Sequence, residues 1–318
     1  MAHVCKPRIA LRPPTLTKIA SHPTLLVLNE GGFTVIDRGA LLRRLLRFTG
    51  RIPTKYKLLY PFWQSAQLSL VTSTRYFDRL PVGLNNLSIA YAADIHYGPL
   101  FRQDRVIDLA KRLQEIQADI IILGGDYGED TASSHAFFDV FPQLSAPLGV
   151  YAVMGNHDHM GSYVAYDHLL DAIRRSCITP LVNEAIRVQK AETRLCICSI
   201  DDIKQGQPDF EPLMDMAKEA DFTIFAPHSP DAFPLALKQP GFSFDLGLAG
   251  HTHGGQLVIL GHSLHSSSRY GDRYRSGWMR LENKDIMVTH GVGTSLLPIR
   301  IGAPAQIHHI ILLRTKAD

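Results

Sequence analysis

The amino-acid sequence predicts a globular α/β fold, and three observations support this prediction. Its 318 residues are 45% hydrophobic and 8% aromatic, which suffices for one large core or two small ones. Short apolar runs alternate with segments of helical periodicity, as in βαβ units. Five of these runs end in Asp, Asn or His. Because ligands gather at the carboxyl ends of strands in α/β sheets, we expect a functional site at one sheet edge.

The first sixty residues differ in charge from the rest of the chain. They hold eleven Lys/Arg and two acidic residues, a net charge of +9, whereas the remainder carries −6. Residues 37–51 have helical spacing that places leucines on one side and four arginines on the other. Two interpretations stay open. The helix either packs against its own domain, or residues 37–63, with Phe62 and Trp63, lie on an anionic membrane surface, where each basic residue contributes about 1 kcal/mol.

We therefore divide the chain into a basic N-terminal extension, residues 1–64, which contains the amphipathic helix, and an α/β domain, residues 65–318. The four cysteines lack a Cys-X-X-Cys spacing, and no secretory leader opens the sequence. We expect a reduced cytosolic compartment, with a peripheral position on the inner face of the cytoplasmic membrane as the alternative. No run of eighteen apolar residues predicts a spanning helix.

The elements of the α/β domain follow one another in a regular order. A strand is predicted over 66–72, and helices over 103–117, 163–177 and 213–220. Buried strands are predicted over 87–93, 120–123, 150–154, 195–200, 222–226 and 244–249. Residues 87–123 form the first predicted strand–helix–strand unit, and a shorter strand is expected near Ile186.

Polar residues follow five of the buried runs directly. In chain order, they are Asp94 and His96, then Asp126, then Asn156 with His157 and Asp158, then His228, and finally His251 with His253. Carboxylate, amide and imidazole groups without sulfur favour Mn, Fe or Zn over a structural zinc site. Seven ligands are too many for one ion. Two ions sharing a carboxylate use all seven, and a pair about 3.5–4 Å apart is suited to holding a phosphoryl group.

In this order and at this spacing, the five motifs resemble those of the calcineurin-like metallophosphoesterase superfamily, over about residues 65–318. The resemblance implies a four-layer α/β/β/α sandwich of two mixed sheets, with a dimetal site at the strand C-terminal edge. It implies that the first metal is held by Asp94, His96, Asp126 and His253. Asp126 would bridge to the second metal, completed by Asn156, His228 and His251. The implied cofactors are two divalent metal ions, manganese first, with iron or zinc as alternatives.

The same resemblance implies hydrolysis by a hydroxide that bridges the two metals and attacks phosphorus in line. His157 resembles the family histidine that protonates the leaving oxygen or stabilises its charge, and Asp158 would orient the His157 imidazole. Two alternatives stay open: His157 only supports a metal ligand, and Asp158 only caps its loop.

A narrower resemblance concerns the substrate. The segments 228–231, 254–256 and 291–300 resemble those of small, often membrane-associated bacterial phosphoesterases, which include a UDP-2,3-diacylglucosamine pyrophosphatase of lipid A synthesis. It implies a phosphorylated small molecule or lipid as substrate, and no nucleic-acid partner is predicted. Arg300 is either an anion contact or a solvated strand-end residue. The alternatives are a broad-specificity phosphodiesterase acting on another phospholipid or on a nucleotide, and a non-catalytic metal-binding scaffold.

Overall fold

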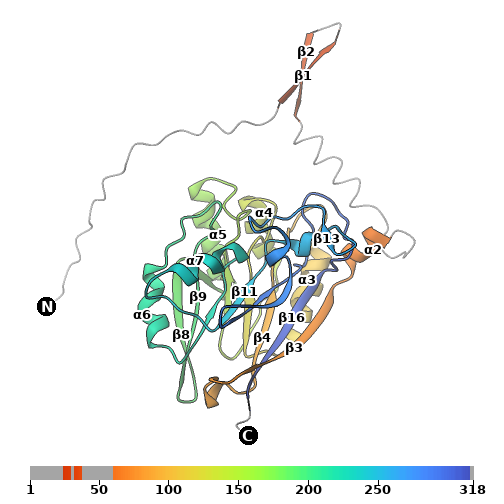
Figure 1. The fold of residues 1–318 in the computed structure, drawn as a ribbon. Helices are drawn as coiled ribbons and strands as arrows, with labels where there is room; N and C mark the ends of the chain where they lie inside the picture. The colour runs from red at the N-terminus through yellow and green to blue at the C-terminus, as the bar shows by residue number, and fades with distance from the viewer. Residues whose placement is uncertain (1–23, 30–31, 38–59, 316–318) are drawn as a thin grey trace, which may run out of the picture. The chain divides into compact units, whose positions relative to one another are not determined.

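The computed structural model describes residues 24–29, 32–37 and 60–315, and the chain divides into two units, residues 1–45 and 46–318 (Figure 1). In the first unit, β1 (Thr24–Asn29) and β2 (Gly32–Asp37) form an antiparallel hairpin. The basic helix predicted over residues 37–51 lies outside the described residues from residue 38 onward. The second unit contains every other described element.

The first six-stranded sheet of this unit has the order β3-β16-β4-β5-β6-β7. Its strands are β3 (Ser69–Phe77), β4 (Leu87–Ala92), β5 (Ile120–Leu123), β6 (Val150–Val153), β7 (Thr179–Leu181) and β16 (Gln306–Arg314). Strands β4 to β7 run parallel, whereas β16 is antiparallel to β4. The helices α3 (Gln103–Glu115), α4 (Thr131–Val140) and α5 (Tyr163–Arg175) contribute apolar side chains to the core on one face of this sheet.

The second six-stranded sheet has the order β14-β15-β11-β10-β9-β8. Its strands are β8 (Glu184–Lys190), β9 (Thr193–Ser199), β10 (Phe222–Phe225), β11 (Leu246–Ala249), β14 (Gly277–Leu281) and β15 (Lys284–Val288). Strands β9, β10, β11 and β15 are parallel, and the two edge strands are antiparallel to their neighbours. Helices α6 (Glu211–Glu219) and α7 (Phe233–Lys238) pack on its outer face.

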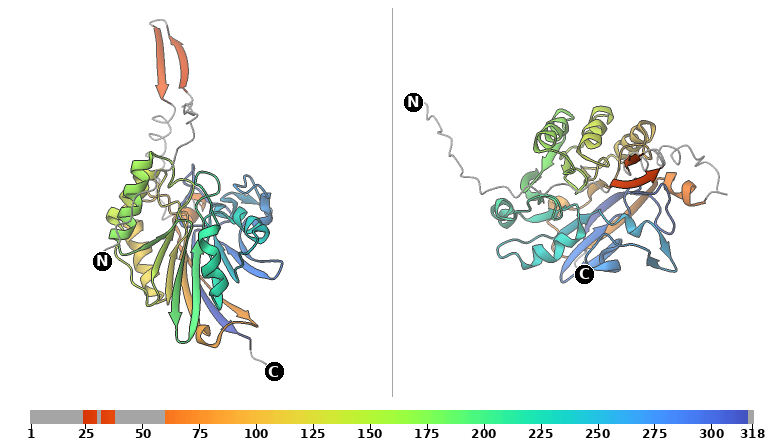
Figure 2. Two further views of the ribbon diagram at one scale, coloured as in Figure 1. Left: turned by 90° about the vertical axis from the view of Figure 1, so that its left-hand side faces the viewer. Right: turned by 90° about the horizontal axis from the view of Figure 1, so that it is seen from above.

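A third core fills the space between the two sheets. It is built from fully buried side chains of both, such as Ile89 and Ile122 from the first and Ile224 and Leu248 from the second. The four runs concerned have consecutive buried residues because both faces of each strand are covered. The predicted α/β/β/α sandwich of two mixed sheets is confirmed (Figure 2).

Two local differences from the predicted elements have physical causes. The strand predicted over 66–72 begins later, because the short helix α2 (Tyr60–Ala66) precedes it.

Periodicity does not predict helix α4, since its sequence is rich in Ser and Thr. Its start is fixed by a capping box, in which the Asp130 side chain accepts from the Ser133 amide. That local signal is present in the sequence.

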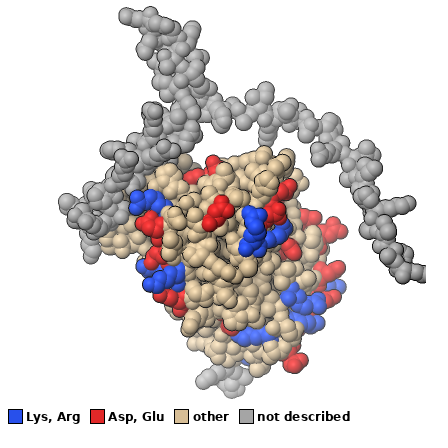
Figure 3. Space-filling model, turned by 180° about the vertical axis from the view of Figure 1, so that it is seen from behind, with Lys and Arg blue, Asp and Glu red and all other residues tan. Residues whose placement is uncertain are grey.

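Lys and Arg are interspersed with Asp and Glu on the face of the molecule shown in Figure 3, without a continuous patch of either sign there. None of the helices in the described part of the chain has the length and apolar character that crossing a bilayer requires.

We expect Ile224→Ala to lower the free energy of unfolding by about 3 kcal/mol, because it leaves a cavity between the sheets. Val82→Ala is the matched control: Val82 is 73% exposed, and we expect a change within about 0.5 kcal/mol. Urea unfolding followed by circular dichroism measures both. Equal effects for the two variants would contradict the assignment of Ile224 to the core.

Candidate metal centre

The polar clusters that follow β4, β5, β6, β10 and β11 meet at one edge of the sandwich. These strands run parallel within their sheets, so that their carboxyl ends point the same way. Hydrogen bonds join the two sheets at this edge. The His251 amide donates to Asp94 Oδ1 at 2.8 Å, and the Val292 amide donates to the Ala93 carbonyl at 2.9 Å. The site therefore lies where both sheets end.

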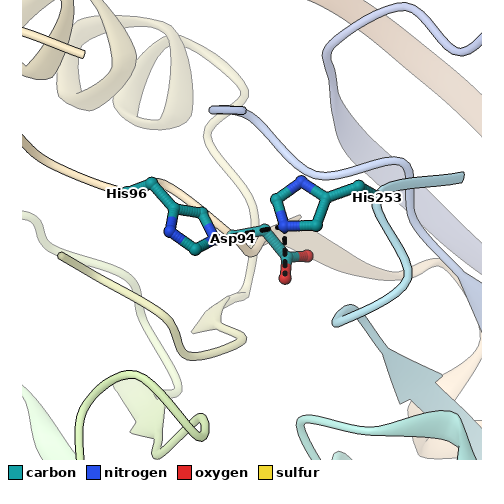
Figure 4. Close-up of side chains that lie close together, drawn as sticks. All are labelled: Asp94, His96 and His253. Carbon is teal, nitrogen blue, oxygen red and sulfur yellow. Dashed lines mark hydrogen bonds and ion pairs between the residues drawn. The ribbon is translucent and has the colours of Figure 1, made fainter. Parts of the chain in front are cut away.

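Six of the predicted ligands form two clusters, each with donor atoms within 4.8 Å of one another. The first contains Asp94, His96 and His253, whose side chains point toward one another in Figure 4, and the second contains Asp126, His228 and His251. Asp126 lies between them: its Oδ2 is 3.2 Å from His228 Nε2 and 3.8 Å from His96 Nε2. The structure thus brings these six residues together, three in each cluster.

The donor set fits divalent cations. His96 Nε2 and His253 Nε2 are 3.1 Å apart, and His228 Nε2 and His251 Nδ1 are 3.2 Å apart. Such close pairs of ring nitrogens around buried carboxylates are expected where a cation binds between them. The seventh predicted ligand, Asn156, is also buried, and its Oδ1 accepts no hydrogen bond from a described residue. A buried amide oxygen without a partner is costly unless a further group binds it.

The carboxylates of the two clusters differ in proton affinity. Burial, reinforced by the charge of Asp126, raises the pKa of Asp94 to about 6, although His228 and His96 oppose this shift. Burial also works against ionisation of Asp126, but His228, His157 and His96 together hold its pKa well below the usual range. Asp126 is therefore an anion, and it is the residue placed between both clusters.

The imidazoles differ as well. Burial, with the positive charges of His228 and Lys204, keeps the pKa of His251 well below its usual range, and burial beside His96 does the same for His253. Both rings are neutral, as a metal ligand must be. Burial alone would lower the pKa of His228, but the adjacent Asp126 carboxylate raises it to about 10. A cation bound at His228 would have to displace a proton.

The backbone at this site is strained. Five ligand residues have φ in the left-handed region, at 55° for Asp94, 52° for His96, 55° for Asp126, 70° for His251 and 51° for His253. Neighbouring glycines are needed because side chains would collide there: a Cβ at Gly155 would overlap the Asp126 carboxylate, and one at Gly250 that of Asp94.

The structure corrects the prediction that Asp158 orients His157. The fully buried Asp158 carboxylate accepts four hydrogen bonds, each of 2.7–3.0 Å, and none comes from an imidazole. Its donors are the amides of Asp126, Tyr127 and Gly155 and the hydroxyl of Ser134. Asp158 therefore holds together the loops that carry Asp126 and Asn156, which is closer to the alternative of a loop cap.

The ring of His157 is instead positioned by Glu129, a residue that sequence reasoning missed. His157 Nδ1 lies 2.9 Å from the Glu129 carbonyl oxygen, and its ring packs edge-on against His96, with centroids 4.8 Å apart. The Glu129 carboxylate is 3.6 Å from His96 Nδ1. His157 thus lies beside the first cluster, and no motif in the sequence marks Glu129.

Arg300 is neither the anion contact nor the solvated residue that the sequence suggested. It is fully buried, and its guanidinium donates to backbone carbonyls of Gly293, Ala303, His290 and His253 at 2.7–3.2 Å. Burial lowers the pKa of Arg300 to about 9. Arg300 therefore joins the loop of His253 to the segment that follows β15.

Two further side chains at the site carry no recognisable motif. Lys204, from the loop after β9, lies with Nζ 2.5 Å from His251 Nε2 and donates to the Ser267 carbonyl at 2.6 Å. Tyr127 is buried, and its hydroxyl donates to the Val153 carbonyl at 2.7 Å. Tyr127 stabilises the fold below the site and leaves the ligand atoms free.

Comparisons with known proteins agree with this geometry. Residues 87–255 match the profile of the calcineurin-like phosphoesterase family, and the chain belongs to this family. It is 31% identical over 250 residues to an uncharacterized metallophosphoesterase of Aquifex aeolicus, covering 76% of this chain and 90% of the relative. It is 30% identical over 242 residues to the uncharacterized metallophosphoesterase YkuE of Bacillus subtilis, covering 74% and 82%. The phosphodiesterase YaeI of Escherichia coli is 29% identical over 224 residues, covering 69% and 79%.

The chain is therefore a phosphoester hydrolase that uses divalent metal ions. The residues that match the family profile include all five polar motifs, since the match extends from β4 to the turn that follows β11.

We expect Mn²⁺ to stabilise the fold by about 4 kcal/mol when free metal is about 1,000 times its Kd, because the ion binds the folded donor set.

Without metal, the stability due to the Asp126–His228 pair is present below the unfolded pKa of His228, 6.5, and is lost as pH rises through about 10. Metal binding instead strengthens as His228 loses its proton. The difference in Tm between Mn²⁺ and EDTA should thus grow with pH, and calorimetry measures it. Equal Tm values at every pH would contradict the site.

Proposed function

We propose that this chain cleaves a phosphodiester or pyrophosphate bond at two divalent cations, one held by Asp94, His96 and His253, the other by Asn156, His228 and His251, with Asp126 shared. The observation that carries the proposal is the position of the Asp126 carboxylate between two buried donor clusters. Bound cations supply a water of lowered pKa as nucleophile and neutralise charge on the phosphoryl oxygens.

Within this proposal, His157 transfers the proton. As an imidazolium, His157 donates Nδ1–H to the Glu129 carbonyl and gives the proton on Nε2 to the leaving oxygen, which leaves the neutral ring with its proton on Nδ1. The His157 amide also donates to Asp126 Oδ1 at 2.9 Å, which fixes this histidine relative to the shared carboxylate. Asp158 acts on the reaction only by holding the two loops in place.

The finer parts of the proposal concern metal, substrate and location. Manganese is the proposed metal, and the oxygen and nitrogen donors, without sulfur, support it alongside iron and zinc. UDP-2,3-diacylglucosamine is the proposed substrate, supported by the resemblance of segments 228–231, 254–256 and 291–300. The proposed location is the cytoplasm, at the inner face of the membrane through residues 37–63. The free thiols of Cys177, Cys196 and Cys198 support a reduced compartment.

A non-catalytic scaffold that keeps the fold is the rival interpretation. Such a scaffold has no need of buried donors, and loss of ligands would relieve both the strained backbone and the close imidazole pairs. Here all seven proposed ligands are present and buried, and His157 lies beside them. These observations favour turnover.

We expect Asn156→Ala and His157→Ala each to lower kcat at least about a hundredfold, but only Asn156→Ala to lower the bound metal, because His157 is not a ligand. Turnover of an aryl phosphodiester and elemental analysis of the purified protein measure the two effects. His135→Ala is the matched control, since His135 pairs with Asp139 on the surface of α4. Full activity of either site variant would overturn the role proposed for that residue.

The substrate is tested by supplying UDP-2,3-diacylglucosamine to the manganese-loaded protein, with the aryl phosphodiester assayed in parallel. Release of UMP and the acylated sugar phosphate faster than the aryl product is the expected result. Turnover of the aryl substrate alone would support the phosphoesterase activity and contradict UDP-2,3-diacylglucosamine as the substrate.

A further inference from the structure

A group of exposed aliphatic side chains lies beside the metal centre, on the hairpin β12 (Val258–Ile259) to β13 (His262–Ser263) and on the segment after Gly293. We name it the apolar rim. Its members are Ile259 at 50% exposure, Leu260 at 95%, Leu264 at 65%, Leu296 at 66% and Leu297 at 47%. Scattered exposed leucines are ordinary, but these five aliphatic residues lie on two loops that are joined by a backbone hydrogen bond from Val258 to Ile301.

Backbone conformation sets two of these leucines apart. Leu260 has φ of 50° and Leu296 has φ of 62°, so each lies at the turn of its loop in the left-handed region. Glycine or asparagine is the residue that such a position favours, because a leucine side chain crowds the backbone there. The leucines stabilise neither the core nor their own turns, which indicates that they are present for their apolar surface.

The apolar rim is joined directly to the metal centre. Gln256 ends the turn that carries His253, and its side-chain amide donates to the carbonyls of Ser295 at 3.0 Å and Leu297 at 3.1 Å. The Ser295 amide donates back to Gln256 Oε1 at 2.9 Å. On the other side, the Val258 amide donates to the Ile301 carbonyl at 2.8 Å. Both loops are thus held at a fixed distance from a metal-binding histidine.

The segment 269–275 adjoins the hairpin and carries three arginines. Arg275 donates to the Gly261 carbonyl at the hairpin turn, at 2.6 Å, and Asp272 accepts from the Ser263 amide at 3.0 Å. Arg269 and Arg273 on this segment are exposed. An apolar tip with an adjoining arginine-bearing segment is compatible with a surface that is apolar inside and carries phosphate groups at its boundary.

We propose that the apolar rim inserts into a lipid surface and presents a lipid phosphoester to the metal centre. A molecule that carries apolar chains and a phosphoryl group together is the ligand that fits a rim adjoining a phosphoesterase site. The inference rests on the proposed function for its substrate class, whereas insertion into lipid is a separate property of this surface.

The test replaces both turn leucines by asparagine in the full-length protein, Leu260→Asn together with Leu296→Asn. Asparagine tolerates left-handed φ, so the variant should unfold at a Tm equal to or above that of the parent. Binding is measured by co-sedimentation with phosphatidylcholine vesicles at high salt, where screening weakens the contribution of the basic N-terminal residues. We expect the double variant to bind about a hundredfold more weakly, or about tenfold for each leucine removed.

Val82→Asn is the control. Val82 is 73% exposed but lies before β4, at the end of that strand opposite Asp94, and its replacement should leave vesicle binding unchanged. Turnover of a lipid phosphodiester in vesicles is compared with turnover of the aryl phosphodiester in solution. The ratio of the two should fall at least about tenfold in the leucine double variant only.

The outcomes separate the two proposals. A parent protein that hydrolyses the aryl substrate but binds no vesicles would contradict lipid insertion by the rim and would support the proposed hydrolytic function. A lowered Tm in the double variant, or a loss of self-association, would also contradict insertion of the rim into lipid. The leucines would then stabilise the fold or bind a second copy of the chain. Vesicle binding that depends on both leucines, without aryl turnover, would retain the rim and reject the proposed function.

Discussion

The left-handed backbone at five of the predicted ligand residues is the constraint on which the rest of this structure depends. Each such residue costs about 1–3 kcal/mol, and this cost persists only where the surroundings fix the conformation. Two buried charged residues outside the ligand set provide that support. Asp158 accepts the amides of Asp126 and Gly155, and Arg300 donates to the carbonyls of His253 and Gly293. Removal of either would leave buried backbone groups without partners, which is more costly than the loss of one surface ion pair.

The two-sheet sandwich explains why candidate metal donors from five strand ends meet at one site without a separate metal-binding domain. Strands β4, β5 and β6 end beside β10 and β11, because the core between the sheets fixes the distance between them. Each strand contributes ligands only from the residues just beyond its last ladder hydrogen bond, where the chain is free to turn. A rigid pair of sheets therefore holds two clusters of donors at a separation that loops alone would not maintain.

The strands and the convergence of the candidate donors were predictable because both follow from local signals: an apolar run buried on both faces, then a polar residue with metal-binding chemistry. Their supports were not. Asp158 lies in the same motif as His157, but its partners, Asp126 and Ser134, are distant in sequence. Arg300 was expected to meet an anion or water, and instead meets carbonyls contributed by loops that follow β11 and β15. Glu129 acts on His157 through its backbone, which no side-chain pattern reveals.

The turn that carries His253 connects the chemistry to the surface. Gln256, directly after this turn, is held in the left-handed region at φ of 48° and binds the loop of Leu296 through its side chain. The apolar rim is therefore linked to the loop of His253 through one residue and a short run of backbone. If the rim lies in lipid during turnover, the turn of His253 and Gln256, together with the loop of Leu296, sets both the depth of insertion and the position of the phosphoryl group. Under the proposed function, substrate specificity would then depend on the rim and the Gln256 turn as much as on the donor clusters, because those clusters would contact only the phosphoryl group.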